Sequence, residues 1–149
     1  MWWITISLDT ISFDEVLHKI LQSESGIKKV ILVDRTGLII ASVSKFSYFP
    51  VEVEPIGASA SAIFSASEYQ GKNLRLGRLE IFTSEFSKGK IFTVSCGPKG
   101  VIVLISDPVI NIGIIRLILK RSSEQIDEIF GESFDLDDED PINFFRFIK

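Results

Sequence analysis

Two short stretches of the sequence are apolar at every position, and they constrain the fold more than any other feature of the chain. The stretches are Val30–Val33 and Val101–Ile105. A strand that has one face in water alternates apolar and polar residues, whereas a strand that is covered on both faces does not. We therefore expect both to be central strands of a sheet with helices on each side, in a three-layer α/β sandwich.

The other segments supply the remaining strands and helices of this sandwich. Asp34-Arg35-Thr36-Gly37 separates Val30–Val33 from a second β-rich run, Leu38–Ala41, and predicts a hairpin turn. Apolar residues that recur at spacings of three and four, next to residues that cap helices, predict the helices. The full predicted order is a helix from Ser12 to about Gly26, the hairpin, a helix from Pro55 to about Tyr69 closed by Gly71, strands over Leu74–Ser84, Ile91–Cys96 and Val101–Ser106, and a helix from Ile112 to Phe130 closed by Gly131.

The strand predicted over Leu74–Ser84 has a special place in this mostly antiparallel, five-stranded sheet. Its alternation of apolar and polar residues shifts by one position around Gly77, from Leu74 and Leu76 to Leu79 and Ile81, which predicts a β-bulge there. We expect the strand at one margin of the sheet. A long apolar strand at a margin leaves backbone groups unpaired, so it is either covered or paired with another subunit.

Segments at both ends lie outside the expected domain. Residues 1–11 form an N-terminal extension in which every second residue from Trp2 to Leu8 is apolar, the period of an extra strand. Residues 12–131 form the domain. Residues 132–149 form an acidic tail that ends in an apolar segment.

Charge and cysteine content exclude several functional classes. The first 131 residues carry 14 acidic and 14 basic side chains, and residues 132–149 carry six acidic and two basic ones, so the tail accounts for the net charge of −4. A neutral body without a basic stripe argues against nucleic-acid binding. The single cysteine, Cys96, cannot form an internal disulfide, so the reducing cytoplasm is the expected compartment. No apolar run has the ~18 residues of a membrane-spanning helix, and the start of the chain is a poor secretory signal.

The sequence offers no catalytic or metal-binding constellation. His18, the only histidine, lies between Leu17 and Lys19 on the polar side of the first helix, where a solvated position is expected. Gly97-Pro98-Lys99-Gly100 joins two predicted strands and so predicts a turn instead of a phosphate loop. The acidic run Asp135–Asp140 lacks the glycine and the closing glutamate of a calcium loop. We therefore predict a protein that is not an enzyme and has no cofactor or metal.

Three stretches of the chain carry a family resemblance. Lys29–Ser42 is a hairpin with an Asp-x-x-Gly turn, and the central helix is rich in small residues. Ile105–Leu117 combines a last strand, an Asn-x-Gly start of the final helix and an arginine within it. In this order and at these intervals, they resemble the Roadblock and dynein light chain family over residues 12–130. The resemblance implies a roadblock/profilin-like fold.

The resemblance also implies a homodimer, or a heterodimer with a roadblock paralogue, in which the third strands pair and the two central helices pack antiparallel. The spacing of small residues in the central helix supports close helix contact independently, although it also fits an ordinary solvent-facing surface. Ile56, Ala60, Ile63 and Phe64 are expected to face the sheet. The residues predicted for the dimer interface are Ala58, Ser61, Ala62, Ser65 and Ala66 of the helix and Leu76, Arg78, Leu79 and Ile81 of the strand.

The function implied by the resemblance is that of a scaffold that binds a Ras-like small GTPase and changes its nucleotide cycle or its location. A structural adaptor without a GTPase partner and a small-molecule sensor are the alternatives. If hydrolysis is stimulated, we expect the protein to position groups of the GTPase without inserting an arginine of its own. Arg75, Arg78 and Arg116 are the arginines that test this expectation.

Two groups of large apolar residues have no obvious place in the core. Exposed aromatic side chains either cover the edge of a core or anchor a partner. Both groups are therefore candidate partner-binding residues, with packing onto the domain as the alternative. They are Phe46, Tyr48 and Phe49, before the central helix, and Phe144, Phe145 and Phe147, at the end of the tail.

Overall fold

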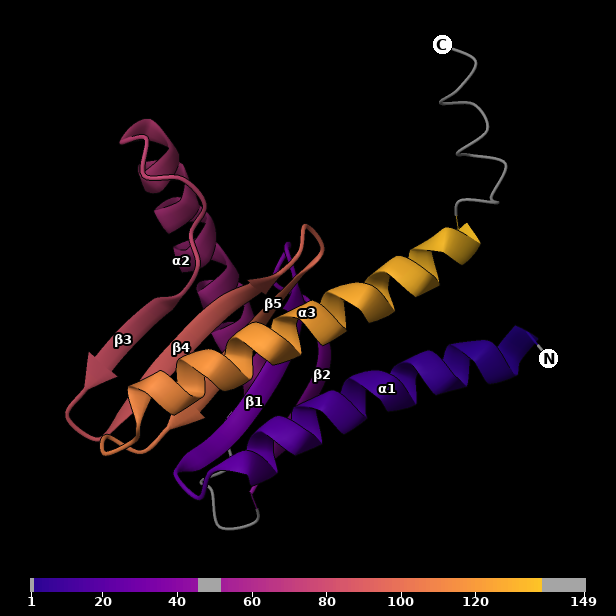
Figure 1. Ribbon diagram of the computed structural model, residues 1–149, viewed down its shortest axis with the longest axis horizontal. Coiled ribbons are helices and arrows are strands. Elements are labelled where there is room, and N and C mark those ends of the chain that lie inside the picture. Colours follow the sequence, from indigo (N-terminus) through magenta and orange to yellow (C-terminus); the bar gives the residue numbers. More distant parts are fainter. Residues whose placement is uncertain (1, 46–51, 138–149) are drawn as a thin grey trace.

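The computed structural model describes residues 2–45 and 52–137, with side chains over 13–45 and 52–132 (Figure 1). Its five strands form one antiparallel sheet in the order β2-β1-β5-β4-β3, so the predicted sheet with the third strand at one margin is confirmed. The elements are α1 (Trp2–Ser23), β1 (Ile27–Asp34), β2 (Ile39–Ser44), α2 (Val53–Asn73), β3 (Phe82–Phe86), β4 (Gly89–Cys96), β5 (Gly100–Ser106) and α3 (Ile112–Asp137).

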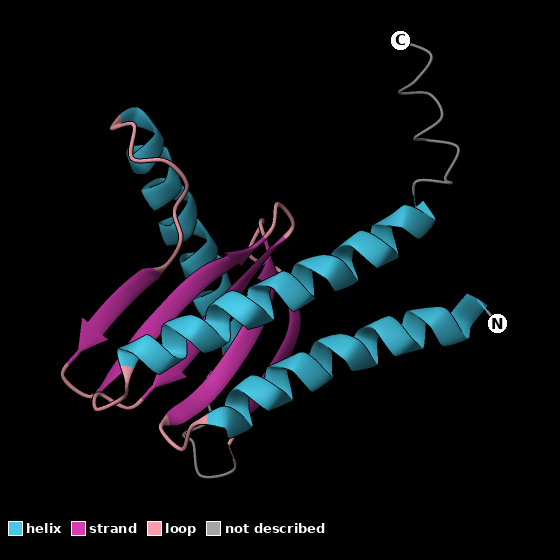
Figure 2. Cartoon of the chain, viewed as in Figure 1, coloured by secondary structure: helices cyan, strands magenta, loops and turns pink. Residues whose placement is uncertain are grey.

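Helices cover both faces of the sheet, as the two apolar runs predicted (Figure 2). α1 and α3 pack against each other on one face, and α2 crosses the other face alone. The central strands β1 and β5 pair from Ile27 opposite Ser106 to Asp34 opposite Gly100. The expected three-layer α/β sandwich is confirmed.

Alternate residues of the two central strands point into two separate apolar clusters. Leu32 and Leu104 face the layer of α1 and α3, whereas Ile31 and Val103 face α2. All four side chains are fully buried. Burying a side chain of this size contributes about 1.5–3 kcal/mol, so the runs without alternation stabilise both sides of the sheet.

The turn between β1 and β2 is held by the carboxylate of Asp34. Its Oδ1 atom accepts hydrogen bonds from the backbone N of Thr36 at 2.8 Å, from the backbone N of Leu38 at 3.0 Å and from the Thr36 hydroxyl at 2.6 Å. Gly37 has a φ of +94°, which residues with a side chain rarely adopt. Desolvation raises the pKa of Asp34, but hydrogen bonds from Thr36, Leu38 and Gly37 outweigh it, and the pKa lies below its ordinary value.

Asp34→Ala is expected to lower the free energy of unfolding by about 1 kcal/mol at neutral pH, because two backbone donors lose their acceptor. The folded-state pKa lies below the unfolded-state pKa. The carboxylate therefore stabilises the fold above the unfolded-state pKa and loses this effect as the pH falls through the folded-state pKa. In urea unfolding, the difference between wild type and variant should shrink below about pH 4. A difference that persists undiminished in acid would contradict the role given to the carboxylate.

The extra N-terminal strand is wrong, because residues 2–23 form one continuous helix, α1. A short run with a period of two also contains pairs four residues apart, such as Trp2 and Ile6, and these suit a helix equally well. The helix start predicted at Ser12 accordingly lies inside α1. α1 also crosses the domain boundary that was predicted between residues 11 and 12.

Glycine does not end the other two helices where the sequence predicted. α2 continues past Gly71 to Asn73, and α3 continues past Gly131 to Asp137, across the predicted boundary at residue 131. A helix tolerates an internal glycine at a cost of roughly 1 kcal/mol.

The start of α3 is capped by Asn111, since its Oδ1 accepts a hydrogen bond from the backbone N of Ile114 at 3.1 Å. Over the described residues, none of the helices is both long and apolar enough to cross a membrane.

β3 is much shorter than the strand predicted for this part of the chain and covers only Phe82–Phe86. The chain leaves α2 through a turn in which Arg75 has a φ of 56° and Gly77 a φ of 87°. Left-handed backbone cannot continue a pleated strand, so no strand runs through residues 75–77. Pairing with β4 begins at Phe82, opposite Thr93. The bulge predicted near Gly77 is therefore a turn that precedes the strand.

Candidate interaction surfaces

Two glycines let α2 lie directly on the β1–β2 hairpin. A Cβ atom on Gly57 would lie 2.7 Å from Cδ1 of Ile39 and 2.9 Å from Cγ1 of Val33. One on Gly37 would lie 2.9 Å from Cα of Ala58. At such distances an added side chain would force its neighbours in the packed interior to move. This close approach fixes how α2 crosses the sheet and which of its faces points outward.

The inner face of α2 consists of Gly57, Ala60, Ser61 and Phe64. Ser61 was predicted for the outer face, but it is buried, and its hydroxyl donates a 2.6 Å hydrogen bond to the carbonyl oxygen of Arg35. Ile63 was predicted for the inner face, but 47% of its surface is exposed. Both assignments are wrong. They placed small side chains on the outer face and large ones on the inner face, whereas the contact of Gly57 with the sheet sets the rotation of the helix.

The outer face of α2 carries small and apolar side chains that no described residue covers. Ala58, Ala62, Ser65 and Ala66 are exposed there. Farther along the helix lies a groove of ≈ 580 Å³. Its apolar lining consists of Ile63, Ala66, Tyr69 and Leu74, of which Ile63, Tyr69 and Leu74 are large side chains left in water.

β3, the last strand of the sheet, presents a free edge. Within the described part of the chain it pairs with β4 on one side and with no strand on the other. Phe86 at its end is 58% exposed, and Phe82 and Ile91, which belong to the α2 side of the sheet, are only half-buried. An edge strand without a cover is a template for pairing with another chain.

The segment before β3 contains the other four residues predicted for the dimer interface, and they do not line one strand. Leu76 is 74% exposed, and Arg78 is exposed as well. Leu79 packs against the cluster under α2, whereas Ile81 packs against the cluster under α1 and α3. Their assignment to the interface stays a prediction.

Arg35 connects three parts of the chain that are distant in sequence. Its Nη1 donates a hydrogen bond to Oε1 of Glu68 at 2.7 Å, and its Nη2 donates one to the carbonyl oxygen of Gly97 at 3.1 Å. The guanidinium also lies 5.3 Å from the ring centre of Phe64, within the range of a cation–π interaction. Arg35 therefore fixes the β1–β2 turn, α2 and the β4–β5 turn relative to one another.

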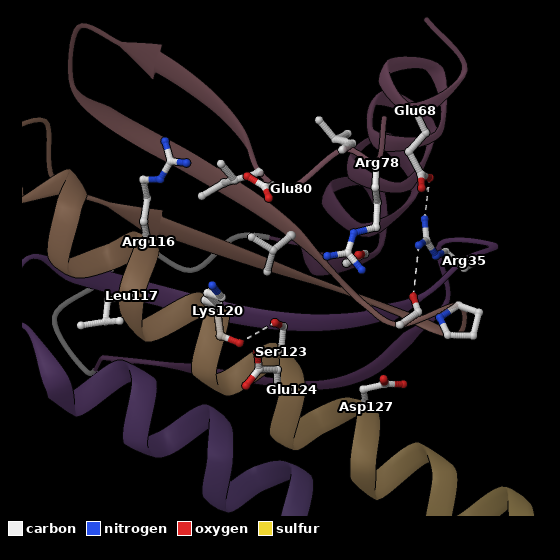
Figure 3. Close-up of a pocket in the computed structure, with 16 residues that line it drawn as sticks. Arg35, Glu68, Arg78, Glu80, Arg116, Leu117, Lys120, Ser123, Glu124 and Asp127 are labelled. Atoms are coloured by element: carbon white, nitrogen blue, oxygen red, sulfur yellow. Dashed lines mark hydrogen bonds and ion pairs between the residues drawn. The ribbon is translucent and has the colours of Figure 1, made fainter. Parts of the chain in front are cut away.

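On the other face of the sheet, a cleft of ≈ 720 Å³ separates α3 from the segment 78–81 (Figure 3). We call it the α3 cleft. Val94 and Ser95 of β4 contribute to its lining, and Arg35 and Glu68 close one end. Its other charged side chains form no ion pair with another described residue. These side chains are Arg78, Glu80, Arg116, Lys120, Glu124 and Asp127.

The candidate chemical groups lie apart from one another. His18 is exposed on α1, and Cys96 is fully buried in the sheet. Burial raises the pKa of the Cys96 thiol far above its ordinary value, so the reactive thiolate is scarce. Among the described residues, no three His, Cys, Asp or Glu side chains are close enough to hold a metal ion.

The six aromatic residues predicted to bind a partner lie outside the described residues. Their role stays a prediction. They are Phe46, Tyr48 and Phe49, in the segment between β2 and α2, and Phe144, Phe145 and Phe147, beyond α3.

A five-stranded antiparallel sheet with one helix on one face and a helix pair on the other defines a roadblock-type sandwich. Residues 13–106 match the family model described as Roadblock/LC7 domain. The chain belongs to this family, and the resemblance seen in the sequence is confirmed.

Proteins of Methanocaldococcus jannaschii are similar over most of the chain. The uncharacterized proteins MJ1340 and MJ0310 are 38% and 37% identical to it over 117 residues. Each comparison covers 78% of this chain and 98% of the relative.

Several solved structures share the fold. Gliding protein MglB of Thermus thermophilus has a TM-score of 0.76 at 21% identity, over 83% of this chain and 92% of that chain. Myxococcus xanthus MglB has a TM-score of 0.74 at 20% identity, over 83% and 90%. The Roadblock/LC7 domain of Streptomyces avermitilis has a TM-score of 0.71 at 13% identity, over 78% and 96%. At these identities the likeness establishes the fold alone.

Proposed function

We propose that two copies of the chain, or one copy and a roadblock paralogue, pair through the outer face of α2 and the edge of β3. We further propose that this dimer is a non-enzymatic, cytoplasmic scaffold that binds and regulates a Ras-like small GTPase. The observation that carries the proposal is the uncovered row of Ala58, Ala62 and Ala66 on α2, in a chain whose last strand is also unpaired along one edge within the described residues.

The chemistry of the α2 face suits a second helix better than it suits water. Small side chains at spacings of four let two helix backbones approach closely. Ile63 and Tyr69 flank them and would add apolar contact area, and Tyr is enriched among the residues that dominate binding energy at interfaces.

The chemistry of β3 suits pairing with a second strand. Natural edge strands are protected by proline, bulges or several charges, whereas Phe82–Phe86 contains no proline and only one charged residue, Glu85. Pairing of two copies of β3 would join two sheets into one and would bring the uncovered parts of the two α2 faces together.

Family membership supports the GTPase partner. The resemblance read from the sequence implies a scaffold beside a Ras-like GTPase, and the fold is shared with gliding protein MglB. One solved MglB structure has a tetrameric arrangement, so assembly of several copies occurs in a protein of this fold. The separation of His18 from Cys96 supports a scaffold over an enzyme.

The test compares proteins captured by immobilised wild-type chain and by the exposed-site variant Ala62→Glu from native lysate. The lysate is loaded with GDP or with a non-hydrolysable GTP analogue, and bound proteins are identified by mass spectrometry. We expect a Ras-like GTPase to be enriched in one nucleotide state and lost with the variant. Capture without any GTPase, or equal capture by the variant, would contradict the proposal.

The arginines then test how the GTPase is affected. With the purified partner, we expect Arg75→Ala, Arg78→Ala and Arg116→Ala to leave any stimulation of GTP hydrolysis in place wherever binding is intact. Loss of stimulation with intact binding would show that an arginine of this chain acts on the nucleotide, against the expected positioning role.

A further inference from the structure

The α3 cleft combines charges of both signs that lack ion-pair partners among the described residues. On the α3 wall, Arg116 and Lys120 form a cationic end, and Glu124 and Asp127 form an anionic end. Figure 3 shows all four side chains along the same helix, with Arg78 reaching into the cleft from the facing segment. The α3 wall, with its charges separated in this way, fits a ligand that carries both signs in a matching order, and the facing segment adds one charge of each sign, Arg78 and Glu80.

The lining between these charges is apolar, and it includes the end of a strand. Leu79, Ile81, Val94 and Leu117 contribute apolar side chains to the cleft, and Leu117 is 50% exposed on α3. β4 continues to Cys96, although its pairing with β3 ends at Thr93. The cleft therefore offers apolar contact and a length of strand edge to an extended segment of chain.

The polypeptide that leaves α3 is long enough to return along this cleft. From Asp137 back to Asp127 the helix measures about 15 Å, and from Asp137 back to Arg116 about 32 Å, at a rise of 1.5 Å per residue. The segment 138–149, which lies beyond the described residues, spans at most about 40 Å when extended. A segment that turns after α3 can therefore cover the cleft from its anionic to its cationic end.

We propose that residues 141–149 of the same chain bind in the α3 cleft, antiparallel to α3. In this direction Arg146 would face Glu124 and Asp127, and the terminal carboxylate of Lys149 would face Arg116 and Lys120. Phe147 would lie on the apolar lining between the charges, and Phe144 and Phe145 would lie at the anionic end, near Pro98. All three are large side chains that are costly to leave in water. The α3 wall of the cleft lies on the face opposite α2, whereas Glu68 of α2 closes one end of the cleft, and Arg78, Leu79 and Ile81 of the facing wall are also predicted for the dimer interface.

The test uses the full chain with Phe144→Ser, Phe145→Ser and Phe147→Ser, which would empty the cleft. A fluorescein-labelled synthetic peptide with the sequence of residues 141–149 is titrated into this triple variant and into wild type. We expect saturable binding to the triple variant and at least about tenfold weaker binding to wild type, because a tethered segment competes at an effective concentration on the order of millimolar. Equal binding to both proteins, or binding to neither, would overturn the proposal.

Charge reversals on one helix show where the peptide binds. Adding Arg116→Glu to the triple variant should weaken peptide binding at least about tenfold, since an attraction becomes a repulsion. Arg121→Glu is the matched control, because Arg121 is exposed on the same helix and does not line the cleft. Equal effects of the two reversals would place the peptide outside the cleft and overturn the proposal.

A cysteine pair tests the same contact without emptying the cleft. In the full chain with Leu117→Cys and Ile148→Cys, mild oxidation should give a disulfide within one chain, identified by peptide mapping, while Cys96 stays buried and unreacted. A disulfide that forms only between two chains would mean that another copy supplies the segment. Absence of any cross-link would mean that the segment does not reach the cleft, and either result contradicts the proposal.

Discussion

Ala62→Glu is expected to convert the proposed dimer into monomers. Ala62 lies on the exposed small-residue face of α2, so the single chain can accept a longer side chain there. At a close contact between two helices, however, each copy would bury a carboxylate without a partner, which costs several kcal/mol. Since 1.4 kcal/mol is a factor of ten, the dissociation constant should rise at least about a hundredfold, as measured by sedimentation velocity over a dilution series.

The matched variant for this test is Ala62→Ser, which adds one oxygen and no charge. It should stay dimeric, and the circular dichroism spectra of both variants should match that of wild type. Ala66→Arg, one turn farther along the exposed face, should act like Ala62→Glu. An unchanged dimer mass for Ala62→Glu would show that the dimer forms through another surface.

Phe64→Ala is expected to lower the free energy of unfolding by about 3–5 kcal/mol, the range for truncating a fully buried aromatic ring. Phe64 is the large side chain of α2 that is fully buried against the sheet, and the guanidinium of Arg35 lies over its ring. Removing it leaves a cavity between α2 and the central strands. Urea unfolding followed by circular dichroism measures the loss.

The neighbouring residue gives the control for Phe64. Ile63→Ala also removes apolar side chain, three carbons against six for Phe64→Ala, but from a position that is about half exposed in the single chain. It should cost the fold less than about 1 kcal/mol when dissociated chains are compared. If Ile63→Ala were as damaging as Phe64→Ala, the orientation of α2 described above would be wrong.

The parts of the fold that the sequence predicted well depend on local patterns. Val30–Val33 and Val101–Ile105 lie in β1 and β5, because apolar residues on both faces of a strand require cover on both faces. The Asp34–Gly37 turn and the Asn111 cap are also local, since their hydrogen bonds join residues at most four apart.

The parts that failed depend on contacts or on backbone geometry that a local pattern does not contain. The first residues of the chain fit a period of two and a spacing of four equally well, and α1 is the form that the structure has. The strand predicted from Leu74 is interrupted by left-handed backbone at Arg75 and Gly77. A non-glycine residue in that conformation is uncommon, so composition alone would not place the turn at Arg75.

The candidate interaction surfaces show the same difference between local patterns, which the sequence reveals, and contacts between distant residues, which it does not. The small residues of α2 were visible in the sequence, but the rotation of the helix depends on how closely Gly57 approaches Val33 and Ile39. Arg35 was missed because its partners Glu68 and Gly97 are 33 and 62 residues away. The α3 cleft was missed for the same reason, since its walls come from residues 78–81 and from α3.

Within its described residues, a single chain leaves the α2 face and the β3 edge uncovered, and we propose that another chain covers them. The most direct measurement is the mass of the purified wild-type chain by light scattering, over concentrations from about 1 to about 100 µM. We predict twice the 16.7 kDa of one chain across the upper part of this range. A mass of 16.7 kDa at the highest concentration would contradict self-association and leave pairing with a paralogue as the only form of the claim to test.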